Sequence, residues 1–277
     1  MPELPEVETV ARSLEPLLRD RRVTGFERYW PKVLHDVSLA AFRKALIGQR
    51  IVRVWRRAKF VIVEFEQGFA LVHLRMTGKP YPLPVLPPKR ERKLISCSFA
   101  LDDGQHLIFE DQRRFGRIYY FASRAALDQW STRFGPEPLG PQFTPHWLRD
   151  SLRMKKRQIK PLLLDQEFIA GLGNIYVDES LWIAKSNPLT RAADVPPAKM
   201  KKLHGAIQEV LEKSIRLNGT SFMNFKFLGG YEGGYTDELL VFARQGQPCL
   251  RCKAPIVKTK VAPRGTHICE RCQPASE

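Results

Sequence analysis

Residues 248–272 read PCLRCKAPIVKTKVAPRGTHICERC and contain four of the five cysteines of the chain. Cys249 and Cys252 form one CxxC motif, and Cys269 and Cys272 form a second one sixteen residues later. This spacing lets two loops present four thiolates tetrahedrally to one Zn²⁺. Because four thiolates close the coordination sphere, such an ion stabilises the fold and performs no chemistry. The stretch therefore predicts one structural zinc ion.

The cysteine-rich stretch also allows roles without zinc or without nucleic acid. The cysteines could be unrelated or form disulfides, but a CxxC pair is too short for a comfortable disulfide, and Cys97 stands alone in an apolar stretch. Basic residues between the two pairs suit a hairpin that contacts phosphates, although they could also form a solvated charged face. Zinc ribbons also bind proteins. These basic residues are Lys253, Lys258, Lys260 and Arg264.

The composition favours a globular protein that binds a polyanion. The chain has 277 residues, of which 43% are hydrophobic, and this suffices for two domains with their own cores. A net charge of +16 and a pI near 9.9 exceed what solubility requires. No run of about 18 apolar residues and no signal-peptide layout is present, which favours nucleic acid over a membrane as the partner, and the cytosol or nucleoid as the location.

The first half of the chain predicts a helix followed by short strands. Between residues 51 and 122, β-branched and aromatic runs are separated by Gln67-Gly68 and Asp103-Gly104, which are typical of hairpin turns. We therefore expect an antiparallel β-sandwich. Before it, residues 2–18 (PELPEVETVARSLEPLL) place apolar side chains at helical spacing, namely Val7, Val10, Ala11, Leu14, Leu17 and Leu18.

The second half predicts helices before the zinc module. Segment 134–148 carries four prolines and is interpreted as a linker. Residues 170–174 (AGLGN) form a turn, and residues 175–184 (IYVDESLWIA) predict an amphipathic helix. A further helix begins near Pro196-Pro197 and ends at Asn218-Gly219.

Basic clusters elsewhere suit contacts to the phosphate backbone. An aromatic side chain next to arginines, as Phe115 is next to Arg113, could enter a base stack, and Met76 could fill the vacated space. Taken singly, Met76 and Phe115 are more often core residues. Asn174 suits a helix N-cap, with or without a phosphate at the helix amides. The clusters are Arg56, Arg57 and Lys59; Arg113, Arg114 and Arg117; and Arg153, Lys155, Lys156, Arg157 and Lys160.

The first residues could supply a nucleophile. Pro2 is small enough for removal of Met1 to be expected, and this would expose a secondary amine. Such an amine can attack a sugar carbon and form an iminium, which a proline within the chain cannot do. Glu3 could then act as general acid or base. The same residues also suit a plain helix start, with Pro2 in the first helical position.

Seven stretches resemble bacterial formamidopyrimidine-DNA glycosylases, in the same order along the whole chain. The PELPE start and the RGTHxCxxCQ end are the most specific of them. The stretches are MPELPEVETV (1–10), RRAKF (56–60), HLRMTG (73–78), DQRRFG (111–116), IKPLLLDQ (159–166), IAGLGNIYVDESLW (169–182) and PCLRCKAPIVKTKVAPRGTHICERCQ (248–273).

The resemblance implies an α+β fold with an N-terminal antiparallel β-sandwich flanked by helices, and a C-terminal helix-two-turn-helix domain with a zinc finger. It implies a monomer of the bacterial cytosol or nucleoid that binds damaged double-stranded DNA between the domains and flips out the lesion. The implied boundaries are 1–133 for the catalytic domain, 134–148 for the linker, 149–220 for the helical domain, 221–241 for a lesion-capping loop and 242–277 for the zinc finger.

The resemblance also implies a role for individual residues. The activity would be excision of oxidised purines such as 8-oxoguanine and formamidopyrimidines, followed by strand cleavage through β,δ-elimination. Pro2 would form a Schiff base with C1′ and Glu3 would move protons, while Lys59 would serve the β step and Arg264 the δ step. Contacts to the gap, the opposite base, phosphates or the lesion strand would come from Met76, Arg113, Phe115, Lys155, Lys160 and Asn174.

Four positions depart from the family pattern. Gln112 replaces a proline, and Lys89-Arg90-Glu91-Arg92 replaces KHxH, so that a DNA-contacting histidine is missing. Residues 241–244 read VFAR in place of VYGR, and residues 230–235 of the capping loop read GYEGGY in place of GKPGYF. These changes leave Pro2 in place and concern the choice of lesion.

Two rival functions remain. The first is a glycosylase of the endonuclease VIII branch that prefers oxidised pyrimidines, against which PELPE rather than PEGPE argues. The second is a non-catalytic, zinc-containing protein that binds damaged DNA.

Overall fold

A computed structural model of the chain describes residues 1–220 and 233–275, which divide into two compact units. Met1–Thr132 belong to the first unit, while Arg133–Thr220 and residues 234–275 belong to the second. The segment predicted as a linker, 134–148, thus lies within the second unit. Its last four residues already form the first turn of a helix that begins at Pro145, because proline suits the first helical position.

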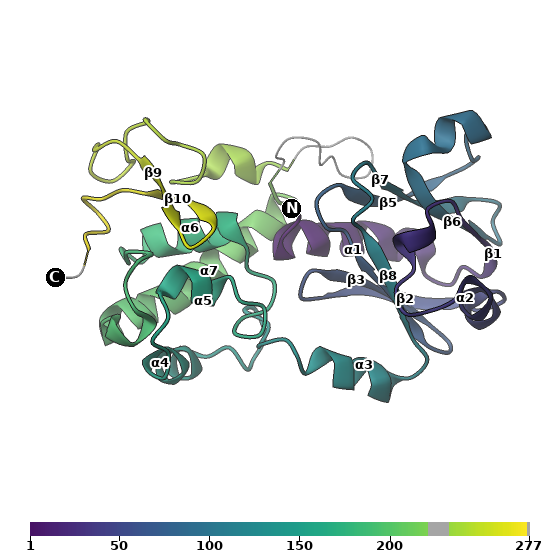
Figure 1. Cartoon of the computed structure of the whole chain (residues 1–277), viewed down its shortest axis with the longest axis horizontal. Helices are drawn as coiled ribbons and strands as arrows, with labels where there is room; N and C mark the ends of the chain where they lie inside the picture. Colours follow the sequence, from purple (N-terminus) through teal and green to yellow (C-terminus); the bar gives the residue numbers. More distant parts are fainter. Residues whose placement is uncertain (221–232, 276–277) are drawn as a thin grey trace. The chain divides into compact units, whose positions relative to one another are not determined.

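The first unit is built on two four-stranded antiparallel sheets that pack face to face (Figure 1). Side chains from both sheets share one apolar core, which confirms the predicted β-sandwich. One sheet has the order β1-β6-β7-β5 and the other β2-β3-β4-β8. The strands are β1 Val23–Arg28, β2 Ile51–Arg57, β3 Phe60–Phe65, β4 Phe69–His73, β5 Gly78–Leu83, β6 Ile95–Leu101, β7 His106–Asp111 and β8 Arg117–Phe121.

Both predicted hairpin turns are confirmed. Gln67-Gly68 joins β3 to β4, and Asp103-Gly104 joins β6 to β7, with Gly68 and Gly104 at positive φ. The pattern did not predict β1, which precedes residue 51 and pairs with β6. Helices flank the sheets, namely α1 Leu4–Leu18, α2 Leu39–Leu46 and α3 Arg124–Ser131, with short 3-10 helices η1 Pro31–Val33 and η2 Lys89–Leu94.

Helix α1 forms where the apolar spacing predicts it. Five of the six apolar residues at helical spacing are buried in the core, whereas Leu17 is 44% exposed. The buried face packs against β2 and β3. The capping box at its start and the apolar stripe therefore place the first residues of the chain beside the sandwich.

The second unit consists of helices and the small sheet of the cysteine module (Figure 1). Helix α7 covers the residues predicted for it and ends before Asn218 and Gly219, both at positive φ. The elements are α4 Pro145–Arg153, α5 Ile159–Leu163, α6 Asn174–Ile183, η3 Ala192–Asp194, α7 Pro197–Arg216, η5 Tyr235–Glu238, β9 Val257–Val261 and β10 Arg264–Ile268.

Helix α6 differs from its prediction. We expected an amphipathic helix, but every residue from 175 to 182 is buried, including Asp178 and Glu179. Glu179 accepts backbone N–H bonds from Leu240, Val241 and Phe242 at 2.8 to 2.9 Å. The two carboxylates are therefore internal anchors for the chain that packs around α6, and they do not mark a solvent face.

Three of the four sequence departures lie within the described residues, and the capping-loop stretch 230–235 is described only from Gly233 onward. In the VFAR stretch, the N–H groups of Val241 and Phe242 donate to Glu179. Gln112 is exposed in the turn between β7 and β8, and the KRER segment belongs to η2. Of the predicted capping loop 221–241, residues 221–232 fall outside the described part of the chain. Among the described helices, none is long and apolar enough to cross a membrane.

Candidate functional site

The residues predicted to carry the nucleophile precede α1. Glu3 is the helix cap, and its N–H donates to Oε2 of Glu6 at 2.8 Å in a capping box. Pro2 lies before this box and is buried, while the proline in the first helical turn is Pro5. The alternative interpretation of Pro2 as the first helical residue is therefore wrong. The box fixes the direction of the chain immediately after Pro2.

Lys59 is held in the tight turn between β2 and β3. Ala58 takes a positive φ of 52°, and Lys59 is only 6% exposed. The pairing of β3 with β4 sets Phe60 opposite His73, and the two rings lie 4.6 Å apart. Lys59 is thus brought close enough to His73 for its charge to act on that ring.

His73 is a neighbour of Lys59 that no sequence pattern singled out. Burial, followed by the positive charges of Arg75 and Lys59, lowers the pKa of His73 to about 3. The ring is therefore neutral at physiological pH. Its Nδ1 accepts the Arg75 N–H at 3.0 Å, so the ring proton lies on Nε2. His73 ends an apolar strand and pairs with Phe60, the residue that follows Lys59 in the turn. A histidine in this position opposite a lysine-containing turn is the signal that could have identified it.

His73 should make the protein acid-sensitive. In the unfolded chain the His73 ring binds a proton near pH 6.5, whereas in the folded chain it does so only near pH 3. The unfolding free energy should therefore fall by about 1.4 kcal/mol per pH unit as the pH drops through this window. His73→Gln should lose this slope in urea denaturation, while His35→Gln, whose ring is exposed, should keep it. Equal slopes in all three proteins would mean that His73 is charged in the folded state.

Met76, Arg113 and Phe115 form one exposed cluster in the first unit. Met76 lies in the turn between β4 and β5, and the other two lie in the turn between β7 and β8. The Arg113 guanidinium donates to Met76 Sδ at 2.8 Å and stands 4.9 Å from the Phe115 ring centroid. Met76 and Phe115 are 43% and 47% exposed, so neither is a core residue. Such a cluster offers two apolar surfaces and one hydrogen-bonding head to a ligand.

Two arginines of the β2–β3 turn are used within the fold. The side chain of Arg56 is only 8% exposed and pairs with Glu8 at 2.9 Å. Arg57 donates to Ser131 Oγ at 2.9 Å. The prediction that these two arginines form a phosphate-binding cluster with Lys59 does not agree with these contacts, because their guanidinium groups already serve the fold.

Lys160 is a buried structural residue, and its contacts do not agree with the prediction that it binds DNA. Its side chain is 0% exposed, and its Nζ lies 2.6 Å from Asp178 Oδ1. The same ammonium donates to Gly265 O at 3.0 Å and to Thr266 Oγ1 at 2.8 Å. Three acceptors use its three N–H groups, so a phosphate has no donor left to bind. The charge pattern along the sequence gives no sign of this burial.

Asn174 contacts the same strand as Lys160. It is the first residue of α6, one position after the cap that was predicted for it, and Gly173 takes the cap position. Its Nδ2 donates to Gly265 O at 2.9 Å. Arg264 is the neighbour of that carbonyl and is exposed at the start of β10. The structure therefore joins Asn174 and Lys160 to the backbone beside Arg264.

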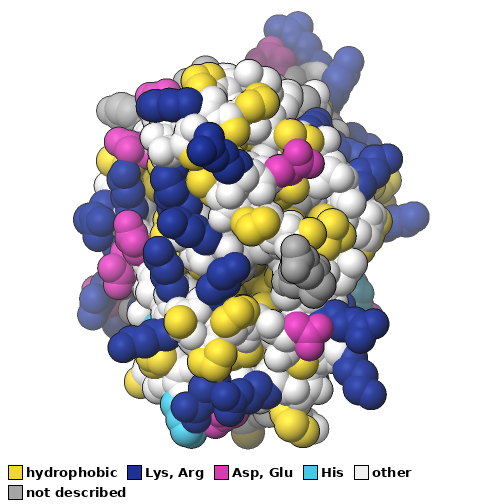
Figure 2. Space-filling view, turned by 90° about the vertical axis from the view of Figure 1, so that its left-hand side faces the viewer, with side chains coloured by type: hydrophobic (Ala, Val, Ile, Leu, Met, Phe, Trp, Pro, Cys, Tyr) yellow, Lys and Arg dark blue, Asp and Glu magenta, His cyan; other side chains and the backbone are white. Residues whose placement is uncertain are grey.

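Lys155 is exposed on the loop after α4, beside exposed Arg153 and Lys156. Figure 2 shows a face of the chain on which Lys and Arg side chains outnumber Asp and Glu side chains. A surface of this sign attracts polyanions before any specific contact forms.

The two lysines allow a matched test. Lys160→Met leaves the buried Asp178 carboxylate without its ion-pair partner, so it should lower the unfolding free energy by about 3 to 5 kcal/mol. Lys155→Met should leave stability nearly unchanged but reduce the salt dependence of DNA binding, the slope of log K against log salt, by about one. Thermal unfolding and anisotropy titrations at several salt concentrations measure both quantities. A reduced salt slope in a stably folded Lys160→Met protein would restore Lys160 as a phosphate contact.

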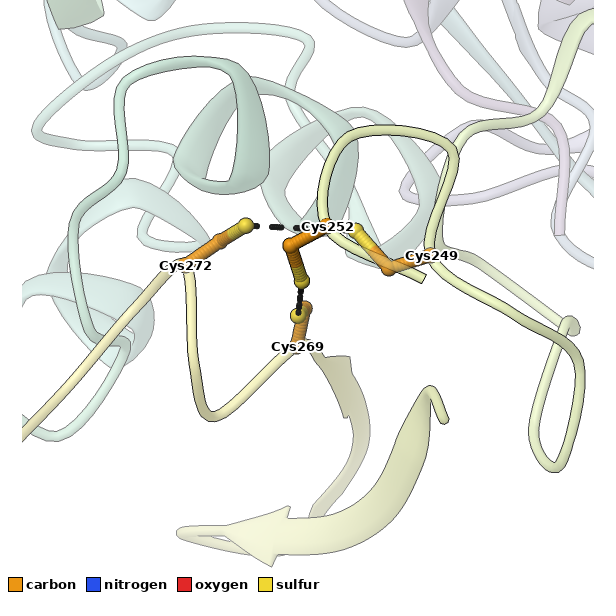
Figure 3. Close-up of side chains that lie close together, drawn as sticks. All are labelled: Cys249, Cys252, Cys269 and Cys272. Atoms are coloured by element: carbon orange, nitrogen blue, oxygen red, sulfur yellow. Dashed lines mark hydrogen bonds between the residues drawn. The ribbon is translucent and has the colours of Figure 1, made fainter. Parts of the chain in front are cut away.

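The four cysteines of the zinc module come together as predicted (Figure 3). Their Sγ atoms all lie within 4.8 Å of one another, and Cys249 and Cys269 are fully buried. All four are free thiols, so the disulfide alternative is not supported. A compact set of four thiolate donors fits one tetrahedral Zn²⁺ and leaves no ligand position open. The residues between the pairs form the predicted hairpin, β9 paired with β10.

Three family models match successive parts of the chain. Residues 1–118 match the formamidopyrimidine-DNA glycosylase N-terminal domain, residues 134–226 match the formamidopyrimidine-DNA glycosylase H2TH domain, and residues 246–275 match a zinc finger found in FPG and IleRS. These matches confirm the fold class and the structural zinc site.

Relatives of the same family match over nearly the full length. Formamidopyrimidine-DNA glycosylases of Chloroflexus aurantiacus and Pelotomaculum thermopropionicum are each 42% identical, over 99% of this chain and 98% and 99% of the relatives. A Lactococcus lactis FPG mutant in complex with Fapy-dG-containing DNA superposes with a TM-score of 0.92, at 36% identity over 99% of this chain and all of that chain. The chain therefore belongs to the formamidopyrimidine-DNA glycosylase family.

Proposed function

We propose that this chain is a bifunctional DNA glycosylase and AP lyase of base excision repair, which removes oxidised purines from double-stranded DNA. Family membership along the whole chain carries this proposal. Related structures hold DNA that contains Fapy-dG or an abasic site, which are the kinds of substrate and intermediate expected here. A monomer in the bacterial cytosol or nucleoid is the form and place in which we expect it to act.

The reaction would start at Pro2 after removal of Met1. The free amine attacks C1′ of the damaged nucleotide, the glycosidic bond breaks and the base leaves with a proton. The buried Glu3 carboxyl next to the amine would move protons in this step. The C1′–O4′ bond then breaks with a proton passing to O4′, so the sugar ring opens and Pro2 and C1′ form an iminium. This iminium acidifies the C2′ hydrogen, so the C3′–O bond breaks by β-elimination and the C5′–O bond then breaks by δ-elimination.

Further residues would hold the DNA or serve the elimination steps. Lys59 would donate a proton in β-elimination, and Arg264 would act in the δ step. Met76, Arg113 and Phe115 would occupy the space of the flipped nucleotide and contact the opposite base. Lys155 and Asn174 would bind the phosphate backbone, while the zinc held by the four cysteines would stabilise the hairpin that carries Arg264.

Borohydride trapping on a panel of damaged oligonucleotides tests this function. The reductant converts an iminium between Pro2 and C1′ into a stable amine, so a covalent complex should form with 8-oxoguanine opposite cytosine and with formamidopyrimidine. Preferential trapping on thymine glycol would favour the endonuclease VIII branch. Absence of trapping by protein from which Met1 is shown to be removed would favour the non-catalytic binder.

A further inference from the structure

The exposed cluster of Met76, Arg113 and Phe115 is assembled from two separate turns that meet at one buried carboxylate. The turn between β4 and β5 carries Met76, and the turn between β7 and β8 carries the other two residues. Gly78, the first residue of β5, pairs with Asp111, the last residue of β7. Asp111 therefore lies where both turns leave the sheet.

Both oxygens of Asp111 are engaged by the turns. Its Oδ1 accepts from the hydroxyl of Thr77 at 2.5 Å and from the N–H of Arg113 at 3.2 Å. Its Oδ2 accepts from the N–H of Gly116 at 2.6 Å. The Thr77 hydroxyl also accepts from the N–H of Arg113 at 3.0 Å. Because Asp111 is only 1% exposed, these bonds are formed away from water and are charge-assisted.

The surroundings leave the turns little freedom. A Cβ at Gly78 would lie 2.5 Å from Leu74 O, and one at Gly116 would lie 2.5 Å from the ring of Phe109. Arg75 and Arg114 both take a φ of 55°, a conformation that costs energy for side-chain-bearing residues. A turn that contains such a residue persists only when further contacts hold it, and the Asp111 carboxylate supplies several of these contacts.

We propose that Asp111, with Thr77 as its relay, is the positioning residue that sets the exposed cluster for insertion into duplex DNA. This inference rests on the proposed function, because an enzyme that flips a damaged nucleotide out of duplex DNA leaves a gap in the base stack for such a cluster to fill. Asp111 itself does not touch DNA in this proposal. It orders the donors and apolar side chains before DNA arrives, so that duplex binding does not have to order them.

Duplex and single-stranded substrates should depend on Asp111 to different extents. An abasic site in a single strand has no opposite base and no gap in a base stack, so Pro2 can reach C1′ without the cluster. On duplex DNA the nucleotide must leave the helix and the cluster must replace it. A defect confined to the duplex therefore reports on positioning, whereas a folding defect would affect both substrates.

Asp111→Asn and the pair Thr77→Val and Thr77→Ser provide the test. In either orientation the asparagine amide would place its NH₂ group against a backbone N–H, that of Gly116 or that of Arg113. We expect the affinity for duplex DNA with a tetrahydrofuran abasic analogue to fall about tenfold. Thr77→Val removes the relay hydroxyl and should cost about fivefold, while Thr77→Ser keeps it and should bind as wild type does. Asp103→Asn, in the exposed hairpin at the other end of β7, is the control.

Borohydride trapping on a single-stranded abasic oligonucleotide is the second readout. All variants should trap at the wild-type rate, and Thr77→Val should melt at nearly the temperature of Thr77→Ser. Wild-type duplex affinity in both Asp111→Asn and Thr77→Val, or an equal loss on both substrates, would overturn the proposal. If Asp111→Asn does not fold, the two Thr77 variants alone decide between these outcomes. Failure of wild-type protein to trap on either DNA would instead refute the proposed function.

Discussion

Pro2→Gly is expected to lower base excision and strand cleavage by at least about a hundredfold while duplex affinity stays close to that of wild type. Glycine still offers a terminal amine, but it lacks the ring that fixes the direction of the nitrogen lone pair. The capping box of Glu3 with Glu6 holds only the chain that follows. Single-turnover cleavage and anisotropy binding on the same lesion duplex measure the two quantities.

Pro5→Ala is the matched control, since Pro5 belongs to the same PELPE motif but lies inside the first turn of α1. It should cleave nearly as fast as wild type. Mass spectrometry of both variants establishes whether Met1 has been removed. Unchanged cleavage by Pro2→Gly, or active enzyme whose amino terminus is still blocked by Met1 or an acyl group, would refute the role of Pro2.

Cys249→Ser or Cys272→Ser should remove zinc and most of the DNA affinity together. A two-stranded hairpin is only marginally stable in water, and a structural zinc ion supplies on the order of 10 kcal/mol or more of folding free energy. The hairpin β9–β10 carries Arg264, Lys258 and Lys260, so its loss should remove the phosphate contacts proposed for it. Zinc content by atomic absorption and duplex affinity at fixed salt test this expectation.

Cys97→Ala controls for the loss of a thiol as such. Cys97 is buried in the sandwich of the first unit, where burial raises the pKa of its thiol, and it lies outside the cysteine cluster. This variant should retain one zinc ion per chain and wild-type affinity. If a zinc-free Cys272→Ser protein bound the duplex as tightly as wild type, the module would not be needed to present the basic hairpin.

Local patterns in the sequence were sufficient for most elements of the fold. The two hairpin turns contain glycines that adopt positive φ, and α7 ends at Asn218 and Gly219, because these residues tolerate left-handed backbone. Predictions failed for segments whose partners lie far away in the sequence. Strand β1 lacks a hairpin partner next to it in sequence and pairs with β6, about seventy residues later.

The candidate site was predicted unevenly for the same reason. Cysteine spacing alone identified the metal ligands, because a CxxC knuckle is a local structure. Charge alone did not distinguish exposed Lys155 from buried Lys160, since the partner of Lys160, Asp178, is eighteen residues away on another helix. The family resemblance assigned both lysines to DNA, whereas the contacts of Lys160 show that its ammonium group is used within the fold.

The sequence by itself determined the family, the zinc ligands, the hairpin turns and the proline expected to act as nucleophile, because each depends on residue type at short spacing. Tertiary structure decided which charged side chains face solvent. It paired Lys160 with Asp178, paired Arg56 and Arg57 with residues of α1 and α3, kept His73 neutral and bonded Asp111 to the two turns that carry Met76 and Phe115. The physical reason is that the energy of a charge depends on its burial and partners, and distant segments supply both.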